Sequence, residues 1–167
     1  ASVATFGDKW PDYWEQLRAN DMMVAGSWSD AYYTSFTKGG GSGQYPLVVS
    51  YATSPPAEII YSPEPKPTAV STSVMSNGCF RQVEYAGVLA GAANPTGAKA
   101  LVDWLASRPV QEDVPLSMFV LPVRADAKLP DVFSKFAGKV PAPITIPAGQ
   151  IDSQLSSWLA QWDAVMN

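Results

Sequence analysis

Short apolar runs of strand length alternate with helical segments along this 167-residue chain. The strand-like runs are residues 46–51, 80–89 and 119–123. Continuous apolar runs of this length are typical of strands buried inside a sheet. Because helical segments lie between them, the sequence predicts an α/β fold.

Helix signals mark residues 11–20, 27–36, 94–107, 110–114 and 151–166. The first of these segments begins with a proline, has an acidic first turn and has a basic last turn. The third begins with Asn-Pro, which is a strong cap and first-turn pair. The last has an apolar stripe at helical spacing. This stripe consists of Ile151, Leu155, Trp158, Leu159, Trp162, Val165 and Met166.

The composition excludes several kinds of chemistry. The chain has no histidine, so it can form neither a Ser-His-Asp triad nor a His-ligated zinc site. Its single cysteine cannot form a structural zinc site or an internal disulfide. Eleven Lys and Arg residues against 15 Asp and Glu give a net charge of −4, which disfavours binding to nucleic acid.

The chain also lacks membrane and export signals. The longest apolar run, near residues 83–93, is interrupted by Glu84 and Gly87 and is shorter than the roughly 20 residues that span a bilayer. Residues 1–9 do not have the pattern of a signal peptide. Residues 2–6 look like the end of a helix that begins upstream, so we expect a soluble fragment or a processed chain.

The best candidate site lies where residues 46–51 lead into a helix start. Tyr51, Ala52, Thr53 and Ser54 place an aromatic ring, two hydroxyls and backbone N–H groups at a strand end, where open α/β sheets bind ligands. Capping of the following helix would explain Thr53 or Ser54 equally well. Trp28 follows Gly-Ser at another helix start, where both ligand binding and packing are open.

An enzyme is less well supported. No Ser-x-x-Lys motif occurs, and nothing in the spacing brings the carboxylates of Glu58, Glu84 and Asp103 together. The glycine-rich run 39–43 lacks the Lys-Ser/Thr that follows a phosphate-binding loop, and it has the composition of a flexible linker. Cys79 is either a buried free thiol or one half of a disulfide whose partner lies outside this chain. The residues therefore predict a binding module, with no catalytic residues, metal or cofactor.

Two motifs resemble a known family. Trp-Ser-Asp-Ala-Tyr at 28–32 and Ser-Tyr-Ala-Thr-Ser-Pro at 50–55 are similar to motifs of the thiamine-binding proteins of ABC importers. These are bilobal type II periplasmic binding proteins. Residues 82–105 resemble the return strand and helix of that superfamily, and 107–111, 119–123 and 158–162 continue the resemblance.

The resemblance implies a two-lobed clamp that closes on thiamine or its phosphates and delivers the vitamin to a membrane permease. Trp28 would stack on the ligand, and Tyr51, Ala52, Thr53 and Ser54 would line the pocket. Phe119 stands where the family has a tryptophan, which keeps an aromatic wall without the indole N–H. Ala57 stands where relatives have a tyrosine, so one aromatic contact is lost.

The resemblance also divides the chain between lobes. Residues 1–80 and 116–167 would belong to the C-terminal lobe, and residues 81–115 would be a return segment of the N-terminal lobe. The helix at 94–107 would then be covered by the absent N-terminal half or by a second copy. The location would be extracytoplasmic, with a lipid anchor left open. Another cation, iron or a polyamine as ligand, and a purely structural or interaction domain, are the alternatives.

Overall fold

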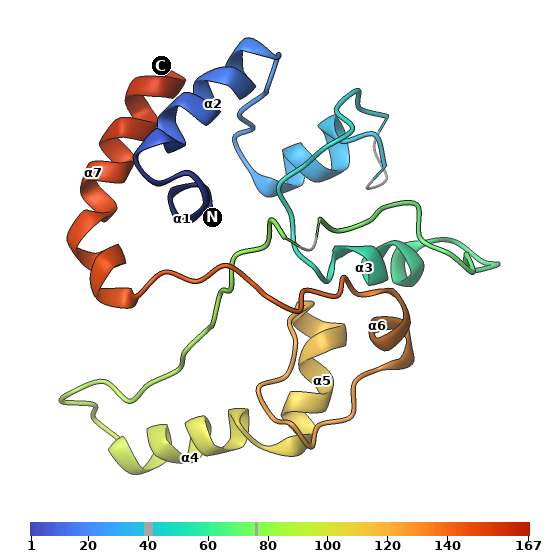
Figure 1. The fold of residues 1–167 in the computed structure, drawn as a ribbon. Helices are drawn as coiled ribbons and strands as arrows, with labels where there is room; N and C mark the ends of the chain where they lie inside the picture. Colours follow the sequence, from blue (N-terminus) through green and yellow to red (C-terminus); the bar gives the residue numbers. More distant parts are fainter. Residues whose placement is uncertain (39–41, 76) are drawn as a thin grey trace. The chain divides into compact units, whose positions relative to one another are not determined.

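Helices account for nearly all of the regular structure in this computed structural model, which describes residues 1–38, 42–75 and 77–167 (Figure 1). The glycine-rich run predicted as a linker therefore lies partly outside the described residues. The α-helices are α1 (Ser2–Phe6), α2 (Trp10–Ala19), α3 (Ser54–Tyr61), α4 (Pro95–Leu105), α5 (Arg108–Met118), α6 (Asp131–Phe136) and α7 (Ala148–Met166). A 3-10 helix, η1 (Gly7–Lys9), and a π-helix, η2 (Asp30–Ser35), complete the set.

The chain divides into two compact units. The first unit comprises Ala1–Val49, Met75–Arg81 and Val140–Asn167, and the second comprises Ser50–Val74 and Gln82–Lys139. The first unit therefore contains α1, α2, η2 and α7, and the second contains α3 to α6. The assignment of residues 1–80, 81–115 and 116–167 to lobes stays a prediction.

Aromatic packing joins α2 to α7 in the first unit, where the two helices lie side by side (Figure 1). The rings of Trp14 and Trp162 meet edge to face, with centroids 4.6 Å apart and planes at 80°. Trp10 and Val165 are buried in the same unit, and the Arg18 guanidinium donates a hydrogen bond to the Val165 carbonyl. The predicted stripe of α7 therefore packs on α2, although Leu155 and Leu159 stay exposed.

A buried ring lies at the centre of the second unit. Phe133 of α6 is almost fully buried, as are Pro56 of α3 and Pro115 of α5. Helices α3 and α6 contact each other, and the ring of Phe119 lies 6.0 Å from that of Phe133 between centroids. This core fixes the start of α3, where the best sequence candidates lie.

The predicted helix starts are confirmed at two positions. The Asn94 side chain accepts a hydrogen bond of 2.9 Å from the Gly97 backbone N–H and so caps α4. Ser27 Oγ accepts one of 3.1 Å from the Asp30 N–H and donates one of 2.8 Å to the Asp30 carboxylate. The predicted helix at 110–114 is longer than expected, since α5 runs through Pro115 to Met118.

The strands predicted at 46–51, 80–89 and 119–123 are not formed. Within the described ranges the only β pairing consists of two isolated parallel bridges, between Phe36 and Tyr45 and between Phe80 and Ile144. No side chain along the expected strands is buried, all of those at 80–89 are exposed, and Tyr85 reaches 90%. A strand is stable only when a neighbour takes up its backbone hydrogen bonds, and here the described residues supply no neighbouring ladder.

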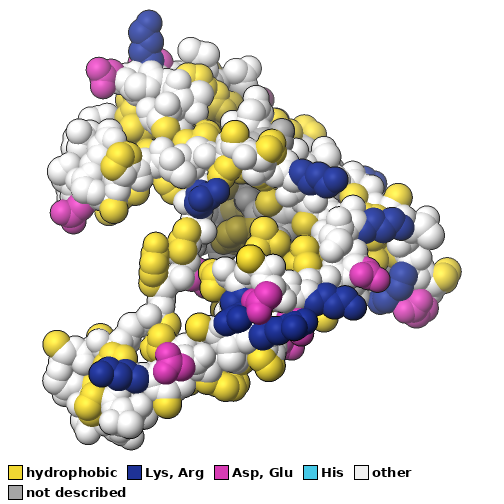
Figure 2. All heavy atoms as spheres, turned by 60° about the horizontal axis from the view of Figure 1, so that its bottom comes forward, with side chains coloured by type: hydrophobic (Ala, Val, Ile, Leu, Met, Phe, Trp, Pro, Cys, Tyr) yellow, Lys and Arg dark blue, Asp and Glu magenta, His cyan; other side chains and the backbone are white. Residues whose placement is uncertain are grey.

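Many apolar side chains are consequently open to solvent. Figure 2 shows hydrophobic side chains among the charged ones on the visible face. On α4, both Leu101 and Trp104 are exposed and no residue is buried, although the helix is amphipathic as predicted.

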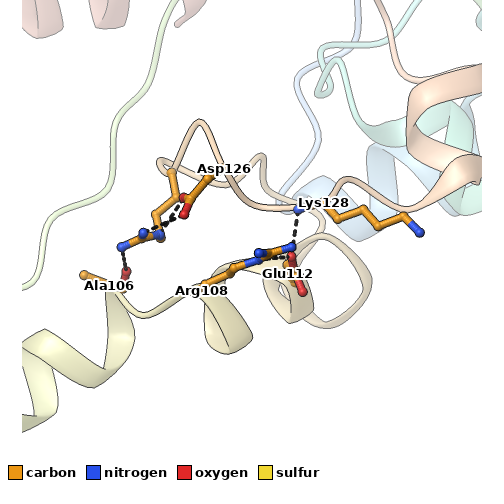
Figure 3. Close-up of polar contacts among 6 residues, drawn as sticks. Ala106, Arg108, Glu112, Asp126 and Lys128 are labelled. Atoms are coloured by element: carbon orange, nitrogen blue, oxygen red, sulfur yellow. Dashed lines mark hydrogen bonds and ion pairs between the residues drawn. The ribbon is translucent and has the colours of Figure 1, made fainter.

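Two ion pairs hold the loop after α5 in the second unit (Figure 3). The Arg108 guanidinium donates a hydrogen bond of 2.7 Å to Glu112, whose same oxygen accepts one of 3.0 Å from the Lys128 backbone N–H. Arg124 contacts the Asp126 carboxylate through two nitrogens, each at 2.8 Å. The hydrogen bond from Arg108, followed by that from Lys128, holds the pKa of Glu112 below its ordinary value.

We expect acidification to release this loop. Because the pKa of Glu112 is lowered by folding, its contribution to stability is present at neutral pH and is lost as the pH falls through the lowered folded-state pKa. Amide exchange at Lys128, measured by NMR, should therefore quicken beyond its intrinsic pH dependence at acidic pH. Glu112→Gln should remove this extra dependence, and unchanged protection in wild type at low pH would contradict the assignment.

The contact between Trp14 and Trp162 should dominate the stability of the first unit. We expect Trp162→Leu to lower the free energy of unfolding by about 2 kcal/mol, because it removes an aromatic pair and leaves a gap. Urea unfolding followed by circular dichroism measures this. Ser156→Ala, at an exposed position of the same helix, is the control. Equal midpoints for the two variants would show that the pair contributes nothing.

Candidate functional site

The residues predicted as a site fall in both units. Trp28 belongs to the first unit, while Tyr51, Ala52, Thr53, Ser54 and Phe119 belong to the second. Each group is described within its own unit.

In the second unit, one hydrogen bond joins the turn before α3 to the end of α5. Thr53 Oγ1 donates to the Phe119 carbonyl at 2.5 Å, and Thr53 is only 6% exposed. The Ala52 carbonyl accepts a hydrogen bond of 2.7 Å from the Gly138 N–H. Thr53 and Phe119, which are distant in sequence, are therefore brought together, and their role in a ligand pocket stays a prediction.

The Thr53 hydroxyl does not cap α3, although capping was the plain alternative. Thr53 stands at the N-cap position, but its side chain makes no cap hydrogen bond. Ser54 Oγ instead accepts from the Tyr51 N–H at 3.2 Å and lies 2.7 Å from Ser50 Oγ. The hydroxyls thus fix the conformation of the turn, and the Tyr51 ring is left exposed beside them.

The start of α3 offers fewer N–H donors than the sequence suggested. Pro55 and Pro56 occupy its first turn and have no N–H. The Ser54 N–H donates to the Tyr51 carbonyl at 3.0 Å. An anion placed here would be bound mainly by hydroxyls, since the usual row of helix N-terminal amides is missing.

Phe119 has an unusual backbone. It ends α5 with φ 56°, in the left-handed region that a bulky residue rarely adopts. Its ring lies 5.6 Å from the Tyr61 ring between centroids, and its carbonyl receives the Thr53 hydroxyl. Such strain persists only where the surroundings enforce it, and it is common at binding sites. Sequence reasoning missed Tyr61, because nothing at the end of a helix signals which ring it will meet.

In the first unit, Trp28 is part of an aromatic cluster with Tyr32, Tyr33 and Phe36. Trp28 stacks on Tyr32, with centroids 4.8 Å apart and planes at 18°. It meets Tyr33 edge to face at 5.4 Å and 84°. Trp28 is 38% exposed, so it combines packing with an accessible ring surface. Of the two roles that the sequence left open, the structure shows packing, and ligand binding by Trp28 stays a prediction.

Glu58 and Cys79, which the sequence analysis also considered, contact neighbouring residues of the chain. Glu58 accepts hydrogen bonds from the Ser71 N–H and the Thr72 hydroxyl, which ties α3 to the following loop. The half-buried Cys79 thiol lies 3.5 Å from the Met75 carbonyl, and its disulfide partner stays a prediction. Within the part of the chain that the structure describes, no group of three or more metal-ligating side chains gathers. None of its helices is long and apolar enough to cross a bilayer.

A cavity of about 450 Å³ lies elsewhere in the first unit. Its lining comes from α1, η1, the start of α2 and α7, and includes Trp10, Trp158 and three glutamines. The sequence candidates do not line it, so it adds nothing to the predicted site.

The comparisons with known proteins agree with the resemblance. No protein-family model matches the chain. It is 30% identical over 162 residues to a thiamine-binding periplasmic protein of Salmonella typhimurium and 28% identical to one of Escherichia coli. Each match covers 97% of this chain and 46% of the relative, so the chain spans about half the length of these relatives. This chain is similar to thiamine-binding periplasmic proteins over nearly its whole length.

The fold gives the same result. A solved periplasmic thiamin binding protein matches 99% of this chain with a TM-score of 0.79 and 26% identity, over 49% of its own length. The predicted likeness to the C-terminal portion of a type II periplasmic binding protein is confirmed by this match. The thiamine-binding relatives are periplasmic by name, in keeping with the predicted extracytoplasmic location.

The hydrogen bond between Thr53 and Phe119 should be required for the geometry of the turn. We expect Thr53→Val to lower the free energy of unfolding by about 1–2 kcal/mol, because it buries the Phe119 carbonyl without its donor. Thr53→Ser keeps the hydroxyl and should lower the free energy of unfolding by less. Denaturant unfolding measures both variants, and a Val variant as stable as wild type would show that the bond is dispensable.

Proposed function

We propose that this chain is part of the solute-binding component of an ABC importer and binds thiamine or a thiamine phosphate for delivery to a permease. The observation that carries the proposal is the similarity to thiamine-binding periplasmic proteins over 97% of the chain. A binding role without catalysis is in keeping with the names of these relatives.

The accessible aromatic rings support a cationic, flat ligand. The thiazolium ring of thiamine is a cation on an aromatic plane, and such groups bind against tryptophan and tyrosine faces. Trp28 in the first unit and Tyr51 in the second both expose part of their rings. We propose Trp28 as a ligand contact in the first unit. In the second unit we propose Tyr51 as a ligand contact, with Ala52, Thr53, Ser54 and Phe119 as the wall next to it.

The surroundings of Tyr51 suit thiamine itself better than its phosphates. Two prolines remove N–H donors from the first turn of α3, and the Thr53 hydroxyl already donates to Phe119. A phosphate would depend on the Ser50 and Ser54 hydroxyls, which lie 2.7 Å apart. We therefore expect tighter binding of thiamine than of thiamine monophosphate, and the ratio of the two affinities tests this part of the proposed site.

We propose that the exposed face of α4 is covered by polypeptide equivalent to the remaining half of the relatives. Leu101 and Trp104 are exposed there, and the preceding residues 82–89 have exposed apolar side chains without a paired strand. A sheet edge would satisfy both, since it would pair the extended backbone and bury the helix face. A second copy of the chain is the alternative, which sedimentation analysis distinguishes by mass.

Calorimetric titration tests the proposed function. We expect the full-length protein to bind thiamine, and Trp28→Ala to weaken that binding at least about tenfold through loss of stacking and cation–π contact. Trp158→Ala, which removes a tryptophan of α7 in the same unit but outside the proposed site, is the matched control.

The possible outcomes separate the alternatives. Unchanged affinity in Trp28→Ala would remove Trp28 from the site. Binding of spermidine or ferric iron in place of thiamine would replace the proposed ligand. Absence of binding to any of these would favour a structural or interaction domain.

A further inference from the structure

The π-helix brings a second exposed ring next to Trp28. Residues Asp30–Ser35 form η2, in which the Phe36 N–H donates to the Ala31 carbonyl, five residues earlier, at 2.9 Å. In an α-helix, residues three and four apart are neighbours, and residue i+5 lies about 140° around the axis. A π-helix closes over five residues, so residue i+5 returns to the side of residue i.

The aromatic contacts follow this wider spacing. Trp28 contacts Tyr32, four residues on, and also Tyr33, five residues on. Tyr33 is also perpendicular to Tyr32, at 5.5 Å and 82°. Tyr33 therefore lies against the edges of a stacked pair, a position that regular α-helical spacing would not give it.

Burial separates the roles of the three rings. Tyr32 is 4% exposed and forms the floor of the cluster, while Tyr33 is 48% exposed beside the partly exposed Trp28. The Asp30 carboxylate, also exposed, lies on the same short segment and adds negative charge. Two accessible aromatic rings with a nearby carboxylate form a surface suited to an organic cation.

We propose that Tyr33 is a second ligand-contacting ring, which together with Trp28 binds the cationic heterocycle in the first unit. This inference rests on the proposed function, because it takes the ligand to be thiamine or a similar flat cation. It adds a residue outside the motif at 28–32 and explains what the π-helix contributes. A ring at position 33 approaches the ligand only because the backbone widens there.

Graded changes of the ring test the proposal in the full-length protein. We expect Tyr33→Leu to weaken thiamine binding at least about threefold, because it removes the negative ring face but keeps an apolar side chain. Tyr33→Phe keeps the ring and should bind within about twofold of wild type. Tyr13→Leu, which removes a tyrosine that stacks on Phe6 elsewhere in the first unit, is the matched control and should bind like wild type.

Fluorinated phenylalanine at position 33 separates ligand contact from packing. Fluorine withdraws charge from the ring face at nearly constant shape, so affinity should fall stepwise from phenylalanine to its pentafluoro form while the thermal midpoint changes little. This series also replaces Tyr33→Leu should that variant fail to fold.

The outcomes distinguish this inference from the function beneath it. If wild type binds thiamine, Trp28→Ala weakens binding and the Tyr33 series has no effect, Tyr33 is not a ligand contact and the proposed function stands. If Tyr33→Phe weakens thiamine binding as much as Tyr33→Leu does, the aromatic ring face does not contribute to binding and the inference is overturned. If wild type binds no thiamine, the proposed function fails, and the inference fails with it.

Discussion

Backbone hydrogen bonding decides which predicted elements this chain forms. A helix satisfies its own N–H and C=O groups, whereas a strand needs a neighbour. The segments with helical periodicity accordingly fold as α2, α4, α5 and α7. The strand-like runs are extended and exposed, apart from isolated bridges in the described part of the chain. The described residues form no sheet that could bury the helix faces. Within the first unit, an aromatic contact between Trp14 and Trp162 packs α2 on α7 instead.

The half-length match to the relatives explains why this constraint is so visible. The chain corresponds to 46% of a thiamine-binding periplasmic protein by sequence and to 49% of a solved structure. Type II binding proteins, which this chain resembles, build each lobe around a sheet to which distant segments contribute. Apolar side chains of residues 82–89 and of α4 are exposed in the described structure, in keeping with the proposal that another polypeptide segment covers them.

Local structure in the two units prepares different parts of the proposed site. Near Tyr51, the hydroxyls of Thr53 and Ser54 are used to fix the turn and to hold the strained Phe119 backbone. Near Trp28, the widened π-helix and the buried Tyr32 ring orient two exposed rings. In both places buried or bonded groups supply rigidity, and exposed aromatic rings supply the proposed binding surface. Because these side chains are already ordered, less conformational entropy is lost when a ligand binds.

Sequence alone predicted the longer helices and supplied the candidate site residues. Asn94 as a cap, Ser27 at a helix start and the α7 stripe follow from local propensity and periodicity, which depend on near neighbours only. The motifs around Trp28 and Tyr51 also gave the family resemblance. Tertiary structure decided the rest. It left residues 46–51 outside any strand ladder, turned the Thr53 hydroxyl to Phe119 instead of the helix end, and placed Tyr33 beside Trp28. Periodicity does not encode these outcomes. Strand pairing and side-chain contacts join residues that are far apart in sequence. A π-turn differs from an α-turn only in which backbone N–H and C=O groups are hydrogen-bonded.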